Sequence, residues 1–337
     1  MTQAAALAAY GSNSPSNRNR IINGDMRIDQ RNAGAAVTAN DNIFGVDRFQ
    51  FAMSQSSKGT SQQSSTAPTG FINSLLFTSS SAYTVGAAET FIIRQHIEGY
   101  NIADLGWGTA SAATITLSFW VRSSLTGTFG GSLVNATVNR SYPFTYTISS
   151  ANTWEQKTLT IAGDTSGTWL TNNGRGISVN WSLGTGATYS GTAGSWASSL
   201  YLSATGATSV VGTNGATFYI TGVQLEEGSV ATPFEHRQYG QELALCQRYF
   251  VSLVMPNGGY WYNLTNGAYR RYSVSFPVVM RTTPSGTAAG AQVNSTPGSP
   301  GVDAISNQGA VASLNGSAAS DLVSWNANGL VTASAEL

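Results

Sequence analysis

The stretch that decides the fold is ATFYITGVQLEEGSVATPFEHRQYGQELALCQRYF, residues 216–250. Residues 216–225 are rich in aromatic and β-branched side chains, which predicts a closing β-strand. Gly228 and Pro233 then supply the backbone angles that a reversal of the chain needs. Apolar residues at helical spacing predict a helix that begins near the first of them: Tyr239, Leu243, Cys246 and Phe250. The stretch therefore divides a long β domain from a smaller domain that follows it.

The clearest strand before this stretch is TITLSFWVR, residues 114–122. Its alternation places one apolar set toward the core: Ile115, Leu117, Phe119 and Val121. Trp120 and Arg122 lie on the opposite face, which in a β-sandwich is either solvent or a concave groove. The same reasoning assigns Trp181 to the core, and Trp154 is also expected to pack there.

Short strands of this kind recur throughout the first two thirds of the chain, separated by turns that contain Gly, Asn and Asp. Residues 21–30 are expected to form the first of these strands. The pattern predicts an all-β protein whose main part is an antiparallel β-sandwich. Spacing alone does not separate a jelly roll from an immunoglobulin-like sandwich.

The chain after the helix, residues 251–337, is expected to form a small C-terminal β domain. Asn-Gly pairs are a strong hairpin signal, so we expect one hairpin around Asn266 and a closing hairpin from residues 321–337. The domain is short and its later half has few aromatic residues, so its core is small. Association of identical copies would supply the missing core, which predicts an oligomer.

The composition limits the partners of the chain. Only 9% of the residues are charged and the net charge is zero, whereas about 25% charged residues is usual. Lysine occurs only at Lys58 and Lys157, so the chain lacks a basic stripe and nucleic-acid binding is not expected. No apolar run approaches the length of a membrane span, so membrane insertion is not expected either. Cys246 is the single cysteine, so no disulfide forms within the chain.

The sequence carries no recognisable catalytic motif. It has none of the patterns CxxC, HExxH, GxSxG or the P-loop. Glu98, Asp104 and Asp164 are candidates for a glycosidase dyad, but nothing in the sequence makes them converge, and solvated or turn carboxylates are preferred. His96 and His236 are interpreted as structural hydrogen-bonding residues. A structural calcium is compatible with the fold, but no ligands are assigned and no other metal or cofactor is expected.

The chemistry that remains is sugar binding. Saccharides stack their apolar C–H faces on aromatic rings, while polar side chains bind their hydroxyl groups. Residues 184–207 form a polar loop that nevertheless holds large aromatic side chains, which indicates a contact surface. The candidate ligand-binding residues are Trp107, Trp120, Arg122, Trp169, Tyr189 and Trp196.

Several segments resemble known families. Residues 222–250 are very similar to the boundary segment of tailed-phage tail fibre and receptor-binding proteins, and RIINGDMRIDQRN, residues 20–32, is similar to their usual opening. The segments LSFWVRS, NTWEQKTLTI and FYITGVQLE resemble jelly-roll carbohydrate-binding modules, which are often embedded in such fibres. This second resemblance selects the jelly roll among β-sandwiches.

The resemblance implies a domain organisation and an assembly. Residues 1–20 would be an attachment peptide that joins other tail or virion proteins, although a disordered tail is the simpler interpretation. Residues 21–235 would form the jelly roll, residues 236–250 the linking helix and residues 251–337 the C-terminal domain. The protein would be a homotrimer, assembled in the host cytoplasm and carried on the virion as a tail fibre.

The leading hypothesis is a non-enzymatic phage tail fibre that binds host-surface polysaccharide through its jelly roll. A second hypothesis is a head decoration fibre, or a fibre collar, that makes protein–protein contacts only. A third is a small glycan depolymerase. Binding to glycans separates the first hypothesis from the second, and release of reducing sugar tests the third.

Overall fold

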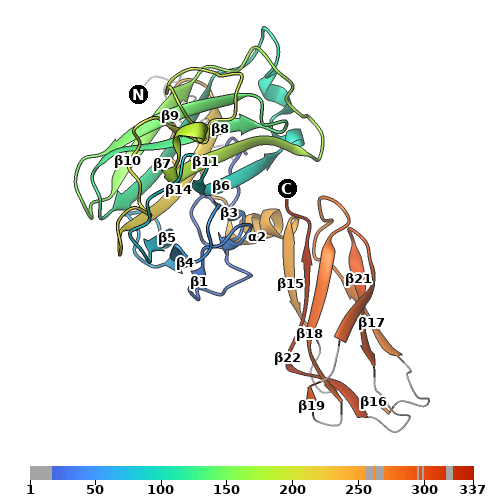
Figure 1. Ribbon diagram of the computed structural model, residues 1–337. Coiled ribbons are helices and arrows are strands. Elements are labelled where there is room, and N and C mark those ends of the chain that lie inside the picture. Colours follow the sequence, from blue (N-terminus) through green and yellow to red (C-terminus); the bar gives the residue numbers. More distant parts are fainter. Residues whose placement is uncertain (1–16, 256–260, 263–268, 294–295, 298–299, 316–321) are drawn as a thin grey trace, which may run out of the picture.

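Two antiparallel six-stranded sheets face each other and form the larger part of the protein (Figure 1). The first sheet contains, in spatial order, β1 (Val37–Thr38), β4 (Gly59–Ser64), β5 (Ser74–Ser79), β14 (Thr217–Glu227), β7 (Ile115–Ser123) and β10 (Glu155–Ile161). The second contains β2 (Phe44–Val46), β3 (Phe49–Met53), β6 (Thr90–Glu98), β11 (Arg175–Thr185), β8 (Gly127–Asn135) and β9 (Ser141–Ile148). The predicted fold class, a jelly-roll β-sandwich followed by a helix and a small β domain, is confirmed.

The structure is a computed structural model that describes residues 17–255, 261–262, 269–293, 296–297, 300–315 and 322–337. Most of the proposed attachment peptide, residues 1–16, therefore lies outside the described residues. So does Asn266, around which a hairpin was expected. Strand β17 (Tyr269–Ser275) pairs with β21 (Gly309–Asn315), whereas β16 (Trp261–Tyr262) pairs with β22 (Leu322–Ser334). The described parts of the two expected arms therefore pair with other strands and not with each other, while the turn itself lies outside the described residues.

The core of the sandwich follows the alternation read from the sequence. The four apolar residues of β7 that were assigned to the core are all fully buried: Ile115, Leu117, Phe119 and Val121. Trp181 of β11 is also fully buried, and its ring lies 6.2 Å from that of Phe49 and 5.9 Å from that of Phe119. The two sheets thus meet around Trp181, as predicted.

The beginning of the chain differs from the prediction. Residues 21–30 form no strand but a buried irregular segment, in which Asn23 and Met26 both adopt a φ of 59°. The side chain of Asn23 donates to the carbonyl groups of Ile28 and Asp47 and accepts from the Ile28 amide. These bonds take the place of strand pairing for the buried backbone groups.

The linking helix α2 (Tyr239–Gln247) begins where it was expected, and it buries the predicted apolar stripe only in part, at Cys246 and half-buried Leu243. Cys246 and Glu242 are buried, whereas Tyr239 is exposed and Phe250 begins strand β15 (Phe250–Val254). The carboxylate of Glu242 accepts a bond from the buried Asn23 amide and lies 3.4 Å from the guanidinium of Arg237. These polar partners explain why a carboxylate lies on the buried side of the helix.

The small domain also consists of two antiparallel sheets. One contains β15, β22, β18 (Ser285–Val293), β19 (Thr296–Pro297) and β16, and the other contains β17, β21 and β20 (Pro300–Ile305). Residues 322–334 form one continuous strand, so the predicted closing hairpin is wrong. The pairing of β22 with β18 shifts register between Ala289 and Ala291, which leaves residues 326–329 in a bulge. The Asn328-Gly329 pair thus lies in a bulge of β22 and does not form a turn.

The end of the chain returns to the sandwich beside α2 (Figure 1). There the carboxylate of Glu336 contacts the guanidinium groups of Arg48 and, at 2.9 Å, Arg31. Arg281 donates to the carbonyl groups of Ala335 and Glu336, and also to Asn173 of the sandwich. We call the group of Arg31, Arg48, Arg281 and Glu336 the C-terminal clamp, since it joins the two β units.

Candidate functional site: an aromatic cluster beside a pocket between sheet edges

Three of the tryptophans selected from the sequence meet in one aromatic cluster: Trp107, Trp169 and Trp196. Their ring centroids are 4.7, 5.3 and 5.4 Å apart, and each pair is arranged edge to face. Trp107 and Trp169 are only 6% and 7% exposed, whereas Trp196 is half-buried. The first two rings therefore support the third, which is the member of the cluster that a ligand can reach.

The indole N–H groups of the cluster are all satisfied by backbone carbonyl groups. Trp107 donates to Ala113 at 2.8 Å, Trp169 to Ser166 at 3.2 Å, and Trp196 to Ala162 at 2.8 Å. These bonds fix the orientation of the rings, because a buried indole donor is costly to leave unpaired. The cluster is consequently a rigid feature of the loops that surround it.

Beside the cluster is a pocket of about 230 Å³, which we call the edge pocket. It lies between β9 and β10, the edge strands of the two sheets, and is bordered by the loop that carries Trp196. Its lining residues are Tyr142, Phe144, Thr145, Leu159, Thr160, Ile161, Ala193 and Gly194. Tyr142 connects pocket and cluster, because its ring centroid lies 5.2 Å from that of Trp196.

The edge pocket is uncharged. Burial raises the pKa of Tyr142 above its usual value, so its phenol remains neutral and can donate a hydrogen bond. On the neighbouring loops, Arg140 makes two bonds of 2.7 Å to the buried carboxylate of Asp164 and a further bond to Ser198. That ion pair braces the loops around the aromatic cluster and adds no net charge to the site.

Trp120 and Arg122 lie elsewhere, on the outer face of β7. Trp120 is half-buried and packs close to Gly222, where an added Cβ would lie 3.0 Å from the indole and 2.7 Å from the ring of Phe71. The guanidinium of Arg122 lies 5.1 Å from the ring centroid of Tyr219. These two predicted residues therefore belong to a second surface, separate from the edge pocket.

Trp154 was expected in the core, but it lies half-buried just before β10 and contacts Tyr219 edge to face at 6.0 Å. It belongs with Arg122 on the outer surface, because the alternation of β10 places it on the same face as the exposed residues Gln156, Thr158 and Thr160. The last predicted residue, Tyr189, ends the 3₁₀ turn η3 (Ala187–Tyr189) and is also half-buried. It shares the loop of Trp196 but does not line the edge pocket.

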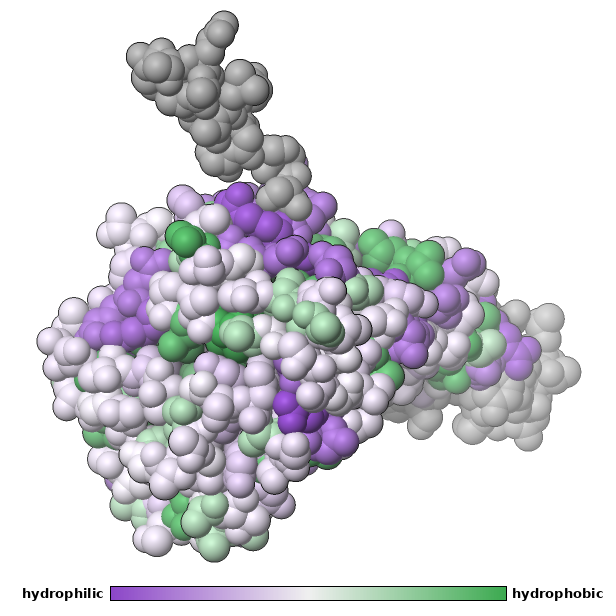
Figure 2. All heavy atoms as spheres, turned by 90° about the horizontal axis from the view of Figure 1, so that it is seen from above, coloured by the Kyte–Doolittle hydropathy of each residue, from purple (hydrophilic) through white to green (hydrophobic). Residues whose placement is uncertain are grey.

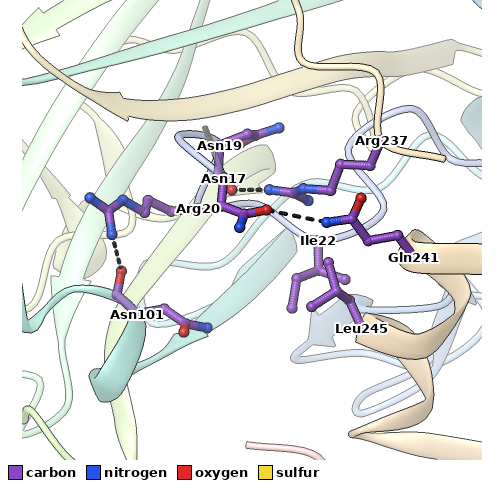
Figure 3. Close-up of a pocket in the computed structure, with 8 residues that line it drawn as sticks. All are labelled: Asn17, Asn19, Arg20, Ile22, Asn101, Arg237, Gln241 and Leu245. Carbon is purple, nitrogen blue, oxygen red and sulfur yellow. Dashed lines mark hydrogen bonds between the residues drawn. The ribbon is translucent and has the colours of Figure 1, made fainter. Parts of the chain in front are cut away.

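A further pocket of about 290 Å³ lies between the first described residues and α2 (Figure 3). Its polar wall contains Arg20 and Arg237, and its apolar floor is formed by Ile22 and Leu245. Arg20 is paired with Asp104, while Arg237 donates to backbone carbonyl groups and faces Glu242. Both guanidinium groups are therefore already occupied by the protein, which makes this pocket a weaker candidate.

The carboxylates considered for catalysis do not form a dyad. Glu98 is bound by Arg248 and Tyr249, Asp104 by Arg20, and Asp164 by Arg140. Glu98 and Asp164 are buried in these pairs rather than solvated, which corrects the expectation for both. Among the residues that the structure describes, no three His, Cys, Asp or Glu side chains gather to hold a metal ion.

The surface is low in charge, as the composition implies. Figure 2 shows mostly residues of intermediate hydropathy on the face seen from above, with small hydrophilic and hydrophobic patches between them. Recognition on such a surface depends on aromatic contacts and neutral hydrogen bonds more than on electrostatic attraction. Within the described ranges, no helix has the length and apolar character needed to cross a membrane.

Sequence reasoning missed the lining of the edge pocket. Alternation does place Tyr142 and Phe144 on one face of their strand, and Leu159 and Ile161 on one face of theirs. The alternation of each pair is compatible with an ordinary core position. What the sequence does not contain is that the two strands are the edges of opposite sheets and lie side by side.

Comparison with known proteins gives only distant likenesses. No protein-family model matches the chain, and no curated protein matches its sequence. Among solved structures, the enzymatically active domain of tailspike protein 4 from bacteriophage CBA120 is 13% identical over 64% of this chain and 22% of that chain, with a TM-score of 0.35. A family 4 carbohydrate-binding module is 13% identical over 61% of this chain and 98% of its own length, with a TM-score of 0.31. A family 11 carbohydrate-binding module from Clostridium thermocellum, in complex with a mixed-linked tetrasaccharide, is 10% identical. The match covers 60% of this chain and 98% of that chain, with a TM-score of 0.31.

Proposed function

We propose that the protein is a non-catalytic glycan-binding protein whose edge pocket accepts a sugar ring. The observation that carries the proposal is the convergence of Trp196 and Tyr142 at the mouth of this pocket, with Trp107 and Trp169 behind them. A rigid aromatic surface beside a small neutral hollow offers the stacking face and the hydrogen-bonding rim that a saccharide needs.

The proposal predicts that Tyr142→Ala and Trp196→Ala weaken glycan binding strongly. Truncating one central aromatic contact costs about 2 kcal/mol or more, which corresponds to a loss of affinity of about thirtyfold. The measurement is binding of the purified full chain to a glycan array, followed by titration with the best glycan. Tyr100→Ala is the matched control, because Tyr100 is 62% exposed and lies outside the pocket.

Trp120→Ala and Arg122→Ala test the second surface in the same assay. If these variants lose binding while Tyr142→Ala keeps it, the ligand site is the outer face of β7 and not the edge pocket. If the wild-type chain binds no glycan on the array, the proposed function itself is wrong.

We further propose that the protein is a phage tail fibre, carried on the virion after assembly in the host cytoplasm. The similarity of residues 222–250 and 20–32 to tail fibre and receptor-binding proteins supports this assignment. Residues 1–20 would join other virion proteins, and host-surface polysaccharide would be the ligand. A head decoration fibre or fibre collar is the structural alternative, and labelled particles viewed by electron microscopy distinguish the locations. Release of reducing sugar from host polysaccharide would instead identify a depolymerase.

We expect the full chain to be a homotrimer and the deletion of residues 251–337 to be a monomer. The small domain supports this expectation, because four of the nine buried apolar residues that the structure describes in its core are alanine: Ala310, Ala312, Ala333 and Ala335. Such a core buries little apolar area for each residue, so association adds a large share of the stability. Light scattering measures the mass of both proteins, and a monomeric full chain at micromolar concentration would contradict the trimer.

A further inference from the structure

We infer that the ligand of the edge pocket is an uncharged sugar residue that carries a methyl group, as a 6-deoxyhexose or an acetylated sugar does. This inference rests on the proposed function, because it assumes that the pocket binds glycan. It adds the chemical class of the ligand, which follows from the floor, the rim and the charge of the pocket.

The floor of the edge pocket is part of the core of the sandwich. Phe144 and Ile161 are buried, and Leu159 is half-buried beside them. Phe144 comes from β9 and the other two from β10, so the floor is formed where the two sheets separate. A hydroxyl group placed against these side chains would lose its bonds to water and gain none from the protein. A methyl group placed there would instead be removed from water at no such cost.

The rim of the pocket offers a small number of neutral hydrogen-bonding groups. The Thr160 hydroxyl already donates to the carbonyl of Ser229. The Gly194 amide donates to the carbonyl of Pro143. The hydroxyl groups of Tyr142 and Thr145 have no hydrogen-bond partner among the described residues. They are therefore available for the ring hydroxyls of a sugar whose methyl group points to the floor.

The neighbouring charges do not favour an acidic sugar. Lys157, on the same strand as Leu159, lies 2.6 Å from Glu155, and Arg140 is held by Asp164. Among the described residues, a carboxylate in the pocket would find both neighbouring cations already paired, and it would lose its hydration. The volume of 230 Å³ is also smaller than the range of about 300–1,000 Å³ that is typical of pockets for drug-sized ligands. One sugar residue, rather than a length of chain, fits this space.

The experiment compares matched sugars by saturation-transfer NMR on the full chain. The pairs are 6-deoxygalactose with galactose, and N-acetylglucosamine with glucose, and glucuronic acid is the charged probe. We expect a methyl-bearing member to bind about tenfold more tightly than its partner, the usual effect of one methyl-sized group in an apolar pocket. The two pairs distinguish a deoxy sugar from an acetylated one.

Two variants test whether the floor produces this preference. Leu159→Asn should reduce it to about twofold or less, since a polar side chain then lines the floor, whereas Leu159→Val should keep it. Thr158→Asn is the control, because Thr158 is exposed and outside the pocket. Thermal unfolding confirms that each variant is folded. If Leu159→Asn does not fold, the matched sugar pairs on the wild-type chain still test the inference.

Different results overturn different claims. Glycan-array binding that depends on Tyr142, together with equal or better binding of galactose, glucose or glucuronic acid, would overturn the inference and leave the proposed function standing. Absence of binding to every glycan would overturn the proposed function, and the inference with it. Loss of the methyl preference in Thr158→Asn would show that the preference does not arise from the floor.

Discussion

Replacing Trp181 with alanine is expected to lower the free energy of unfolding of the β-sandwich by about 3–5 kcal/mol. Trp181 is fully buried, and its ring contacts Phe49 of its own sheet and Phe119 of the opposite sheet. Its removal leaves a cavity between two sheets that are held in place by long hydrogen-bonded ladders, so the site cannot collapse around it. Urea denaturation followed by circular dichroism measures the loss.

Trp154→Ala is the matched control for this prediction. It removes the same side chain from a half-buried position on the outer surface, where its ring contact is with Tyr219. The expected loss is below about 1 kcal/mol, since a partly exposed ring leaves a space that water can fill. Equal losses in the two variants would contradict the assignment of Trp181 to the centre of the core.

Where a strand has one buried face, the sequence was sufficient to predict the structure. The alternation of Ile115, Leu117, Phe119 and Val121 identified the core side of β7, and that of residues 176–183 identified Trp181. The reason is that a period of two leaves each side chain only two directions, and apolar residues select one of them.

Local patterns were insufficient where tertiary contacts decide the backbone. Residues 21–30 have the composition of a strand, but Asn23 binds distant carbonyl groups and turns the segment into buried irregular structure. The Asn328-Gly329 pair has the composition of a hairpin turn, but β22 pairs with β18 on both sides of it. In both places, hydrogen bonds to residues far away in the chain outweigh the local preference.

The candidate site shows the same limit. Trp107, Trp169 and Trp196 were selectable from the sequence as large aromatic residues in or near polar loops, and the structure brings them together. The edge pocket itself was not predictable, because it depends on β9 and β10 being the edges of opposite sheets. That adjacency is a property of the whole strand order, which no single strand encodes.

The C-terminal clamp is the second place where one substitution is expected to lower the stability strongly. Glu336 is the shared partner of Arg31 and Arg48, and the side chain of Arg48 is only 2% exposed. Arg48 also donates to the carbonyl of His96, and its guanidinium lies 3.5 Å from the ring centroid of Tyr249. Without the carboxylate of Glu336, the buried guanidinium of Arg48 would still contact the His96 carbonyl and the Tyr249 ring. It would have no negative charge to balance its own.

A nearby carboxyl group makes the clamp sensitive to pH. Burial raises the pKa of Asp47 to about 6, while Arg31 acts in the opposite direction and the like charge of Glu336 adds to the increase. Because the folded pKa lies above the unfolded one, the folded chain binds this proton more tightly. The stability that Asp47 contributes is therefore fully present below its unfolded pKa, about 4, and is lost as the pH rises through 6.

Glu336→Gln is accordingly expected to lower the free energy of unfolding by about 3 kcal/mol, the lower end of the range for breaking a buried ion pair. The loss should be larger at about pH 5 than at about pH 7, because only ionised Asp47 repels Glu336 and that repulsion disappears in the variant. Denaturation at both pH values measures the difference, and carboxyl-carbon NMR should show the pKa of Asp47 moving down. Glu227→Gln, which alters an exposed carboxylate, is the control. A loss of the same size in both variants, or an unchanged Asp47 titration, would mean that Glu336 does not hold the two β units together through these arginines.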